Sequence, residues 1–272
     1  MDLNKIYQGD SLDILKTFPD ESINCCVTSP PYWGLRNYQV EGQLGLEETP
    51  EEYVEKMVKV FREVKRVLKD DGTCWLNLGD SYGDEKQLTG IPWRVAFALQ
   101  ADGWWLRQDI IWHKPNPMPE SVTDRCTKSH EYIFLLTKSA KYYFDNDAIK
   151  EDSVYPDDDR KSRTKDYQKY AGNGHNTVAF GSATYPKRNK RSVWTINTQP
   201  YKEAHFAVFP EKLPELCIKA GTKKGDTVLD PFFGSGTTGY VAQRLGRKWI
   251  GIELNEEYIK IAEKRFAQQE MF

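Results

Sequence analysis

The sequence LDPFFGSGTTGY, residues 229–240, is the part of the chain that most constrains its fold. Residues 226–230, DTVLD, have alternating apolar character and end in an acid, which predicts a strand. Residues 237–245 are compatible with a helix, and the glycines between the two segments predict a tight turn. The order of strand, glycine turn and helix is typical of a Rossmann-like α/β unit.

A second acid strengthens this interpretation. The apolar run at residues 249–252 ends in Glu253. Glu253 follows Asp230 at about the 20-residue spacing at which Rossmann-like units present an acid to ribose hydroxyls. The turn also fits the pattern G-x-G-x-x-G through Gly234, Gly236 and Gly239. Because glycines at such turns are often only steric necessities, this half alone predicts a nucleotide or nucleoside site of unspecified kind.

The stretch TSPPYWGLRNY, residues 28–38, carries the second signal. Residues 23–28 predict a buried strand that ends directly in Ser29 and two prolines. The prolines fix two backbone torsions and remove two amide donors, which leaves the Pro30 carbonyl as an acceptor beside the Ser29 hydroxyl. Two acceptors and the Tyr32 ring suit an exocyclic NH2 group on a flat heteroaromatic base. The structural alternative is a Pro-Pro turn with a packed tyrosine.

Together these stretches resemble the site-specific DNA methyltransferases that modify the exocyclic amine of cytosine or adenine, in the β-type order with the catalytic half first. The resemblance covers nearly all of the chain, including QGDSLDIL, GTCWLNLGDSY, GWWLRQDIIWHKPNPMPESVTDRCTKSHEYIFLLTKS, HFAVFPEKL and GIELNEEY. It implies an α/β fold with a Rossmann-like S-adenosylmethionine-dependent methyltransferase sheet in circularly permuted order. The implied parts are a catalytic half at residues 1–137, an inserted target-recognition region at 138–200 and an S-adenosylmethionine-binding half at 201–272.

The resemblance also implies roles for individual residues. The implied catalytic set is Ser29, Pro30, Pro31 and Tyr32. The implied cofactor-binding set is Asp10, Asp230, Pro231, Phe232, Gly234, Ser235, Gly236, Thr237, Thr238 and Glu253. In that set the 230–238 loop wraps the methionine part, Glu253 takes the ribose hydroxyls and Asp10 lies near the adenine. Asp10 could instead cap a helix that starts near Ser11, and Phe232 could instead belong to the core.

The charge distribution predicts a DNA-binding segment. The formal net charge of the chain is −2, yet residues 160–191 contain nine Lys or Arg residues and one acid, a local charge of +8. Cations neutralise phosphates, and the interleaved amides and aromatic residues can reach base edges. The alternative is a solvated loop, the usual fate of a charge run. The predicted DNA-binding residues are Trp33, Arg36, Arg160, Lys161, Arg163, Lys165, Lys187, Arg188, Lys190 and Arg191.

The rest of the chain predicts a single doubly wound sheet. Its 272 residues, 39% hydrophobic, suffice for one large α/β domain with an inserted module. Helices are expected at residues 50–69 and 92–101, and strands at residues 73–78, 106–112 and 132–137. Ligands bind at the carboxyl edge of such sheets. We therefore expect Ser29 and Asp230 to face each other there, with the interval 152–189 as the boundary between the halves.

The residues predict direct methyl transfer to an aromatic amine. The lone pair of such an amine is delocalised into the ring, and acceptors at Ser29 and the Pro30 carbonyl favour a more tetrahedral nitrogen. A base inside a duplex cannot reach this pocket, so it must flip out and stack on Tyr32, with Trp33 beside it. By the resemblance, the neutral Ser29 hydroxyl favours cytosine N4, with adenine N6 as the alternative. The chain lacks the Pro-Cys motif of carbon-5 cytosine methylation.

Other functions stay open at this point. A nicotinamide-dependent oxidoreductase would account for the glycines and Glu253 but not for Ser-Pro-Pro-Tyr. A non-catalytic DNA-binding module would account for the basic segment alone. RNA or protein glutamine is a closer alternative substrate, because related methyltransferases use Asn-Pro-Pro-Tyr on them, and Ser29 in place of Asn disfavours it.

The composition of the chain bears on metal binding and on the compartment in which the protein acts. Five cysteines and four histidines show no ligand spacing, so we predict no structural metal. The amino terminus is polar, and no run approaches the about 20 apolar residues that span a bilayer. We therefore expect a cytoplasmic protein that acts on double-stranded DNA, without a membrane. A homodimer and a cognate restriction endonuclease are candidate partners that the sequence does not decide.

Overall fold

The structure, a computed structural model, describes residues 1–83, 86–153, 186–199 and 210–269. The chain divides into two compact units, of which the larger comprises Met1–Asp145 with Ser192–Phe272 and the smaller is Asn146–Arg191. The smaller unit lies within residues 138–200, and the assignment of that range as a target-recognition region stays a prediction. Residues 193–195, after the smaller unit, form a short strand of the main sheet.

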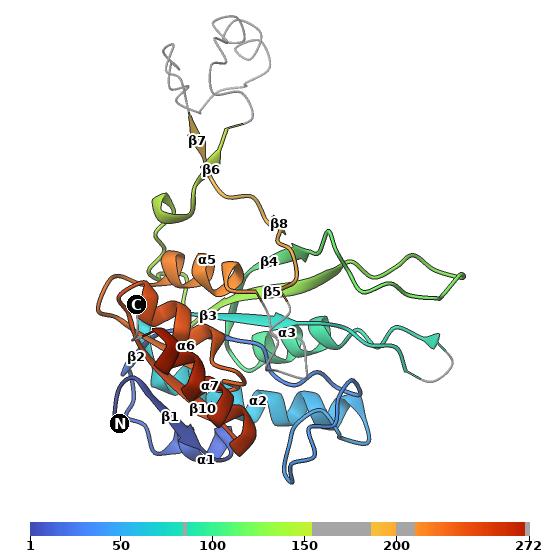
Figure 1. The fold of residues 1–272 in the computed structure, drawn as a ribbon, viewed down its shortest axis with the longest axis horizontal. Coiled ribbons are helices and arrows are strands. Elements are labelled where there is room, and N and C mark those ends of the chain that lie inside the picture. Colours follow the sequence, from blue (N-terminus) through green and yellow to red (C-terminus); the bar gives the residue numbers. More distant parts are fainter. Residues whose placement is uncertain (84–85, 154–185, 200–209, 270–272) are drawn as a thin grey trace, which may run out of the picture. The chain divides into compact units, whose positions relative to one another are not determined.

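The larger unit contains an eight-stranded sheet with the order β1-β10-β9-β2-β3-β5-β4-β8 (Figure 1). Its strands are β1 (Lys5–Gln8), β2 (Ile23–Thr28), β3 (Leu68–Leu78), β4 (Trp105–His113), β5 (His130–Thr137), β8 (Val193–Thr195), β9 (Thr227–Asp230) and β10 (Lys248–Glu253). Among the described strands of this sheet, β5 alone runs antiparallel to its neighbours. Strands from the two ends of the chain interleave, which is the permuted Rossmann-like arrangement that the sequence predicts.

Helices cover the sheet in two groups. One group is α1 (Ser11–Lys16), α2 (Pro50–Val67) and α3 (Ile91–Ala101), which contact one another in sequence along one face. The other group is α5 (Lys212–Gly221), α6 (Thr237–Arg244) and α7 (Glu256–Gln269), which likewise contact one another. The fold is therefore doubly wound.

Helix α2 shows why the sequence folds as predicted. Thr49 caps it by accepting a hydrogen bond from the Glu52 N–H at 3.2 Å, and Pro50 stands in the first turn, where no amide donor is required. The apolar face predicted for this helix is buried, including Tyr53, Met57, Val60, Phe61 and Val64. These side chains join the core between the helix and the strands β3 and β5.

The smaller unit has its own short elements. The strands β6 (Glu151–Asp152) and β7 (Lys187–Arg188) pair antiparallel, and the 3-10 helix η2 (Asp147–Ile149) precedes them. Within the described part of the chain, no helix has the length and apolar character required to cross a membrane.

Candidate active site

The two sequence motifs meet where β2 and β9 lie side by side. Cys26 is paired with Leu229, so these parallel strands end together at the carboxyl edge of the sheet. Thr28, the last residue of β2, donates a hydrogen bond from Oγ1 to Asp230 Oδ1 at 2.6 Å. The sequence prediction that both motifs open at one edge is confirmed.

The glycine turn after β9 is held by the end of β10. Gly236, the N-cap of α6, has φ 80°, a left-handed conformation that favours glycine. Gly234 donates its N–H to Glu253 Oε2 at 2.7 Å, and Asn255 donates its N–H to Oε1 at 2.8 Å. Burial raises the pKa of the Glu253 carboxyl. A carboxylate has about four acceptor positions, so Glu253 keeps capacity for further donors.

Phe233 fixes how closely α6 approaches β10. A Cβ atom on Gly239 would lie 2.6 Å from Phe233 Cζ, and one on Gly251 would lie 2.3 Å from Phe233 Cγ. The ring also stacks on Trp249, with 5.2 Å between centroids. The third glycine of G-x-G-x-x-G is therefore required for packing of the helix against the strand.

Two buried oxygen atoms beside this turn have no hydrogen-bond partner among the described residues. They are Asp230 Oδ2 and Ser235 Oγ. Asp230 is 1% exposed, and its other oxygen accepts from Thr28 and from the Phe232 N–H at 3.0 Å. Burial raises the pKa of Asp230 from 3.8 to about 7. Because buried polar atoms are normally paired, the two oxygens fit a ligand that donates hydrogen bonds and carries positive charge.

Three other residues of the predicted cofactor set have partners within the fold. Thr237 Oγ1 accepts from Arg265 Nη1 at 3.0 Å, and Thr238 Oγ1 donates to the Val27 carbonyl at 3.2 Å. Phe232 is half-buried and packs against the hydrophobic core. Both hydroxyls thus join α6 to neighbouring elements, which is a structural role that the sequence analysis did not assign to them.

Asp10 lies at the start of α1, at the same edge of the sheet. Its carboxylate caps the helix by accepting from the Asp13 N–H at 3.1 Å, which is the structural alternative named for it. The neighbouring Ser11 hydroxyl donates to the Pro231 carbonyl and so joins α1 to the glycine turn. Asp10 is exposed, and its predicted place near the adenine stays a prediction.

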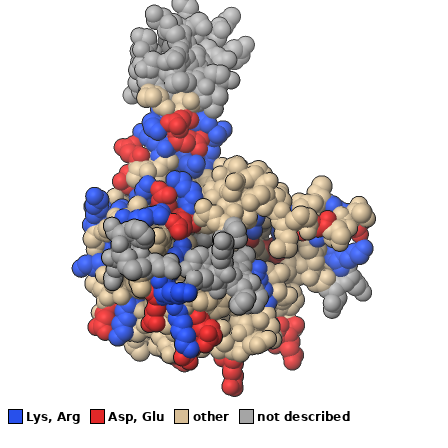
Figure 2. Space-filling model, in the orientation of Figure 1, with Lys and Arg blue, Asp and Glu red and all other residues tan. Residues whose placement is uncertain are grey.

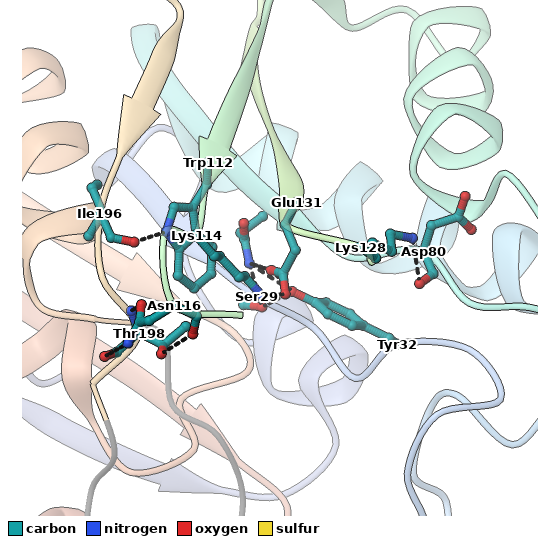
Figure 3. A network of polar contacts seen from close by, with 11 residues as sticks. Ser29, Tyr32, Asp80, Trp112, Lys114, Asn116, Lys128, Glu131, Ile196 and Thr198 are labelled. Carbon is teal, nitrogen blue, oxygen red and sulfur yellow. Dashed lines mark hydrogen bonds and ion pairs between the residues drawn. The ribbon is translucent and has the colours of Figure 1, made fainter. Parts of the chain in front are cut away.

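The predicted catalytic motif is part of a hydrogen-bonded network (Figure 3). Ser29 Oγ lies 3.1 Å from the Tyr32 hydroxyl, which donates to Glu131 Oε2 at 2.7 Å. Asn77 Nδ2 lies 2.7 Å from the Tyr32 hydroxyl, 2.9 Å from Glu131 Oε2 and 3.3 Å from Ser29 Oγ. Lys114 forms an ion pair with the other oxygen of Glu131. Residues within or just after four neighbouring strands, β2, β3, β5 and β4, therefore form one polar cluster.

Sequence analysis missed Asn77, Lys114 and Glu131. The available signals were a polar residue inside the buried run WLNL, and an acid at the start of the apolar strand EYIFLL. β5 is antiparallel, so its first residues, not its last, reach the carboxyl edge of the parallel strands. Topology is required to place Glu131 beside Tyr32.

The two prolines differ in their contacts. The Pro31 carbonyl accepts from the Tyr53 hydroxyl at 2.8 Å, whereas Pro30 is buried and no described residue donates to its carbonyl. The Tyr32 ring lies on the Gly79 backbone, where a Cβ would be 2.6 Å from Cε2. The role of the Pro30 carbonyl as an acceptor for an amine stays a prediction.

Two further contacts fix the rim of this edge (Figure 3). Trp112 Nε1 donates to the Ile196 carbonyl at 2.8 Å, and the Thr198 N–H donates to Asn116 Oδ1 at 3.0 Å. These bonds hold the chain that follows β8 against the end of β4. Opposite them, Lys128 Nζ donates to the backbone carbonyl of Asp80 at 2.8 Å.

The structure describes only some of the predicted DNA-binding residues. Trp33 donates its indole N–H to the Glu47 carbonyl at 3.0 Å and packs against the core, while Arg36 is half-buried. Four predicted contacts, Arg160, Lys161, Arg163 and Lys165, lie outside the described residues. For Trp33 the structure thus shows a packing role beside the motif.

The four basic residues in the described part of the basic segment form ion pairs with two acids of β6. Arg188, Lys190 and Arg191 lie 3.0, 3.2 and 2.7 Å from Glu151, and Lys187 lies 2.6 Å from Asp152. Figure 2 shows acidic and basic side chains side by side over β6 and β7. The local charge of +8 counted over residues 160–191 does not include these two acids, which lie just outside that range. The DNA-binding role of the segment stays a prediction.

A family model described as DNA methylase, covering N6 and N4 methyltransferases, matches residues 23–264. The chain belongs to this DNA methylase family. It is 46% identical to the type II methyltransferase M.SmaI of Serratia marcescens, with 97% of this chain and 91% of that protein aligned. It is 45% identical to M.Cfr9I of Citrobacter freundii, with 96% and 86% aligned.

Solved structures agree with this assignment. The cytosine-N4-specific PvuII DNA methyltransferase superposes with a TM-score of 0.74 at 25% identity, covering 98% of this chain and 87% of that one. A protein from Thermus thermophilus, solved as a complex with S-adenosyl-L-methionine, gives a TM-score of 0.67 at 25% identity, covering 97% and 93%. The sheet and helices of this DNA methylase are thus those of S-adenosylmethionine-dependent methyltransferases.

Proposed function

We propose that this DNA methylase transfers a methyl group from S-adenosylmethionine to the N4 amine of a cytosine flipped out of duplex DNA. One observation carries the proposal. At the junction of β2 and β9, Ser29 and Pro30 directly follow Thr28, which donates to the buried carboxylate of Asp230, and Asp230 Oδ2 has no partner among the described residues. An amine site at Ser29 and Pro30 would therefore adjoin a site for a cationic ligand at Asp230.

The second half of this junction holds the cofactor. The cofactor is S-adenosylmethionine, as in the complex solved from Thermus thermophilus. Asp230 Oδ2 and Ser235 Oγ would accept hydrogens from its ammonium group, and Glu253 would accept from its ribose hydroxyls. When bound, it supplies a methyl group to the amine nitrogen, and the electron pair of the broken sulfur–carbon bond stays on sulfur.

The first half orients the amine. Ser29 Oγ and the Pro30 carbonyl accept the two amine hydrogens, so the nitrogen lone pair points away from them, toward Asp230 and the glycine turn. As nitrogen gains positive charge it becomes acidic, and one hydrogen leaves as a proton for water without a strong base. Tyr32, held against Gly79 and Glu131, offers an aromatic side chain beside the acceptors.

The choice of cytosine rests on two supports. Ser29 is a neutral acceptor, which within this type of enzyme is associated with the cytosine amine. The PvuII enzyme, to which the fold is similar, is named as cytosine-N4-specific. Both M.SmaI and M.Cfr9I are named type II methyltransferases, so we also propose that this chain protects DNA against a restriction endonuclease of the same recognition sequence.

Separating cofactor binding from transfer tests the proposal. Ser29→Ala and Tyr32→Ala should bind S-adenosylmethionine normally in calorimetry yet lose about 10²-fold or more of methyl transfer to DNA, because a preorganised contact is removed. Asp230→Ala should lose cofactor binding itself. Ser139→Ala, which alters a serine at the opposite end of β5, is the matched control and should change neither. If both motif variants lost the cofactor, the proposed division of roles would be wrong.

A further inference from the structure

Glu131 occupies a place that the proposed reaction leaves unexplained. Its side chain is only 14% exposed, and one oxygen forms an ion pair with Lys114, itself 19% exposed. The other oxygen accepts from the Tyr32 hydroxyl at 2.7 Å and from Asn77 Nδ2 at 2.9 Å. In this ion pair Glu131 is an anion, and an ionised carboxylate has no hydrogen to donate. Every contact to it must therefore be a donation by the neighbour.

The negative charge of Glu131 determines the direction in which the Tyr32 hydroxyl hydrogen points. The phenol has one hydrogen, which points at Glu131, so its two remaining positions can only accept. Burial and the nearby Glu131 charge raise the pKa of Tyr32 well above its usual value, which keeps that hydrogen in place. Asn77 Nδ2, at 2.7 Å, supplies a donor to one acceptor position. The remaining position faces Ser29.

The Ser29 hydroxyl is then fixed in turn. Ser29 Oγ and the Tyr32 oxygen lie 3.1 Å apart, which is a hydrogen-bond distance, so one of the two hydroxyls must donate to the other. Tyr32 has none left, so Ser29 donates to Tyr32. The Asn77 NH2 group has two hydrogens, which the shorter contacts to Tyr32 and Glu131 use, so the 3.3 Å contact supplies no further hydrogen to Ser29. What Ser29 offers to a ligand is therefore its lone pairs.

We infer that Glu131 is a positioning residue that, through Tyr32, fixes Ser29 as an acceptor toward the target amine. The inference rests on the proposed function. Without an anion at this position, Tyr32 could turn its hydrogen toward Ser29. The Ser29 hydrogen could then point at the amine lone pair and oppose attack on the methyl group. Glu131 thus acts on Ser29 through two hydrogen bonds, and a third joins Ser29 to the amine nitrogen.

The test is Glu131→Gln, a substitution of equal shape whose amide can both donate and accept. We expect kcat for DNA methylation to fall by roughly 10- to 100-fold, less than for direct loss of a transition-state contact. The KM for DNA and the calorimetric affinity for S-adenosylmethionine should stay within about twofold. Glu120→Gln is the matched control, because Glu120 also pairs with a basic residue, Arg125, and has no contact with Ser29 or Tyr32.

A double-mutant cycle distinguishes positioning from a structural role. Tyr32→Phe removes the connecting hydroxyl, so adding Glu131→Gln to it should lower kcat by less than about twofold further. If the two effects multiplied, Glu131 would not act through Tyr32 and the inference would be overturned.

Glu131→Gln could lower kcat by destabilising the fold, because it leaves Lys114 partly buried without its anion, so a second variant is needed as a control. The double substitution Glu131→Gln with Lys114→Gln removes both charges and should show the same loss of kcat. A double variant with wild-type kcat would overturn the inference. An inactive wild-type protein would refute the proposed function instead, whereas an active wild type with an equally active Glu131→Gln would refute only the positioning role.

Discussion

Replacing Asp230 by asparagine should stabilise the ligand-free protein. The carboxyl is 1% exposed, and burial raises its pKa from 3.8 to about 7. The folded state therefore favours the neutral form, and the stabilising contribution is complete below pH 3.8 and lost as pH rises towards 7. Above pH 7 the buried anion costs about 4 kcal/mol relative to the unfolded chain, at about 1.36 kcal/mol per pKa unit.

Asparagine removes this cost but introduces a new one. Its oxygen can keep the bonds from Thr28 and the Phe232 N–H, while its NH2 group replaces Oδ2, which has no partner among the described residues. An unpaired buried donor costs about 1–3 kcal/mol. The net expectation at pH 8 is that Asp230→Asn raises the free energy of unfolding by about 1–3 kcal/mol, while cofactor binding is lost.

Urea denaturation of both proteins between pH 4 and pH 9 measures this difference. Near pH 4 the variant should be less stable than the wild type by about 1–3 kcal/mol, because only the cost of the unpaired donor remains there. Its stability relative to the wild type should rise with pH and level off above pH 7. The wild type should also bind S-adenosylmethionine more tightly as pH rises to 7, because a cationic ligand favours the anion. A variant that is less stable than the wild type at pH 8, or a difference independent of pH, would refute the argument from burial.

Three further results are expected. Gly251→Ala should lower the free energy of unfolding by about 3 kcal/mol, because the new Cβ would lie 2.3 Å from Phe233 Cγ, whereas Gly83→Ala, with no atom nearer than 3.6 Å, should be neutral in the same denaturation assay. Glu151→Gln should strengthen DNA binding in a filter or anisotropy assay, because it removes a negative charge that lies beside three basic side chains; unchanged affinity would mean that these side chains do not contact DNA. Replacing Arg188, Lys190 and Arg191 together by Ala should flatten the dependence of log affinity on log salt by up to roughly three units if all three contact phosphate.

The sequence predicted the elements that have strong periodicity or a specific turn. Residues 23–28 form β2 as expected, and residues 237–245 form α6 to within one residue. Short strands at the edges were missed: β1 has four residues and β8 three. Their pairing depends on partners far away in the chain, which local pattern does not reveal.

Only part of the site was predicted, because the rest depends on strand pairing that local sequence pattern does not reveal. Ser29 and Asp230 stand at the ends of strands with a recognisable motif, so their proximity followed from the rule for parallel sheets. Glu131 stands at the beginning of an antiparallel strand, and only the observed register brings it to that edge. The ion pairs of the basic segment with Glu151 were not predicted, because they depend on the β6–β7 ladder and not on the charge within one stretch of sequence.

The chemical identity of the product tests the central claim most directly. Duplex DNA should be incubated with the protein and S-adenosylmethionine labelled in its methyl group, digested to nucleosides and analysed by mass spectrometry. The account predicts labelled N4-methyldeoxycytidine, which Ser29→Ala should reduce by about 10²-fold or more. Labelled N6-methyldeoxyadenosine without N4-methyldeoxycytidine would contradict the choice of base, and DNA without label would contradict the proposed function.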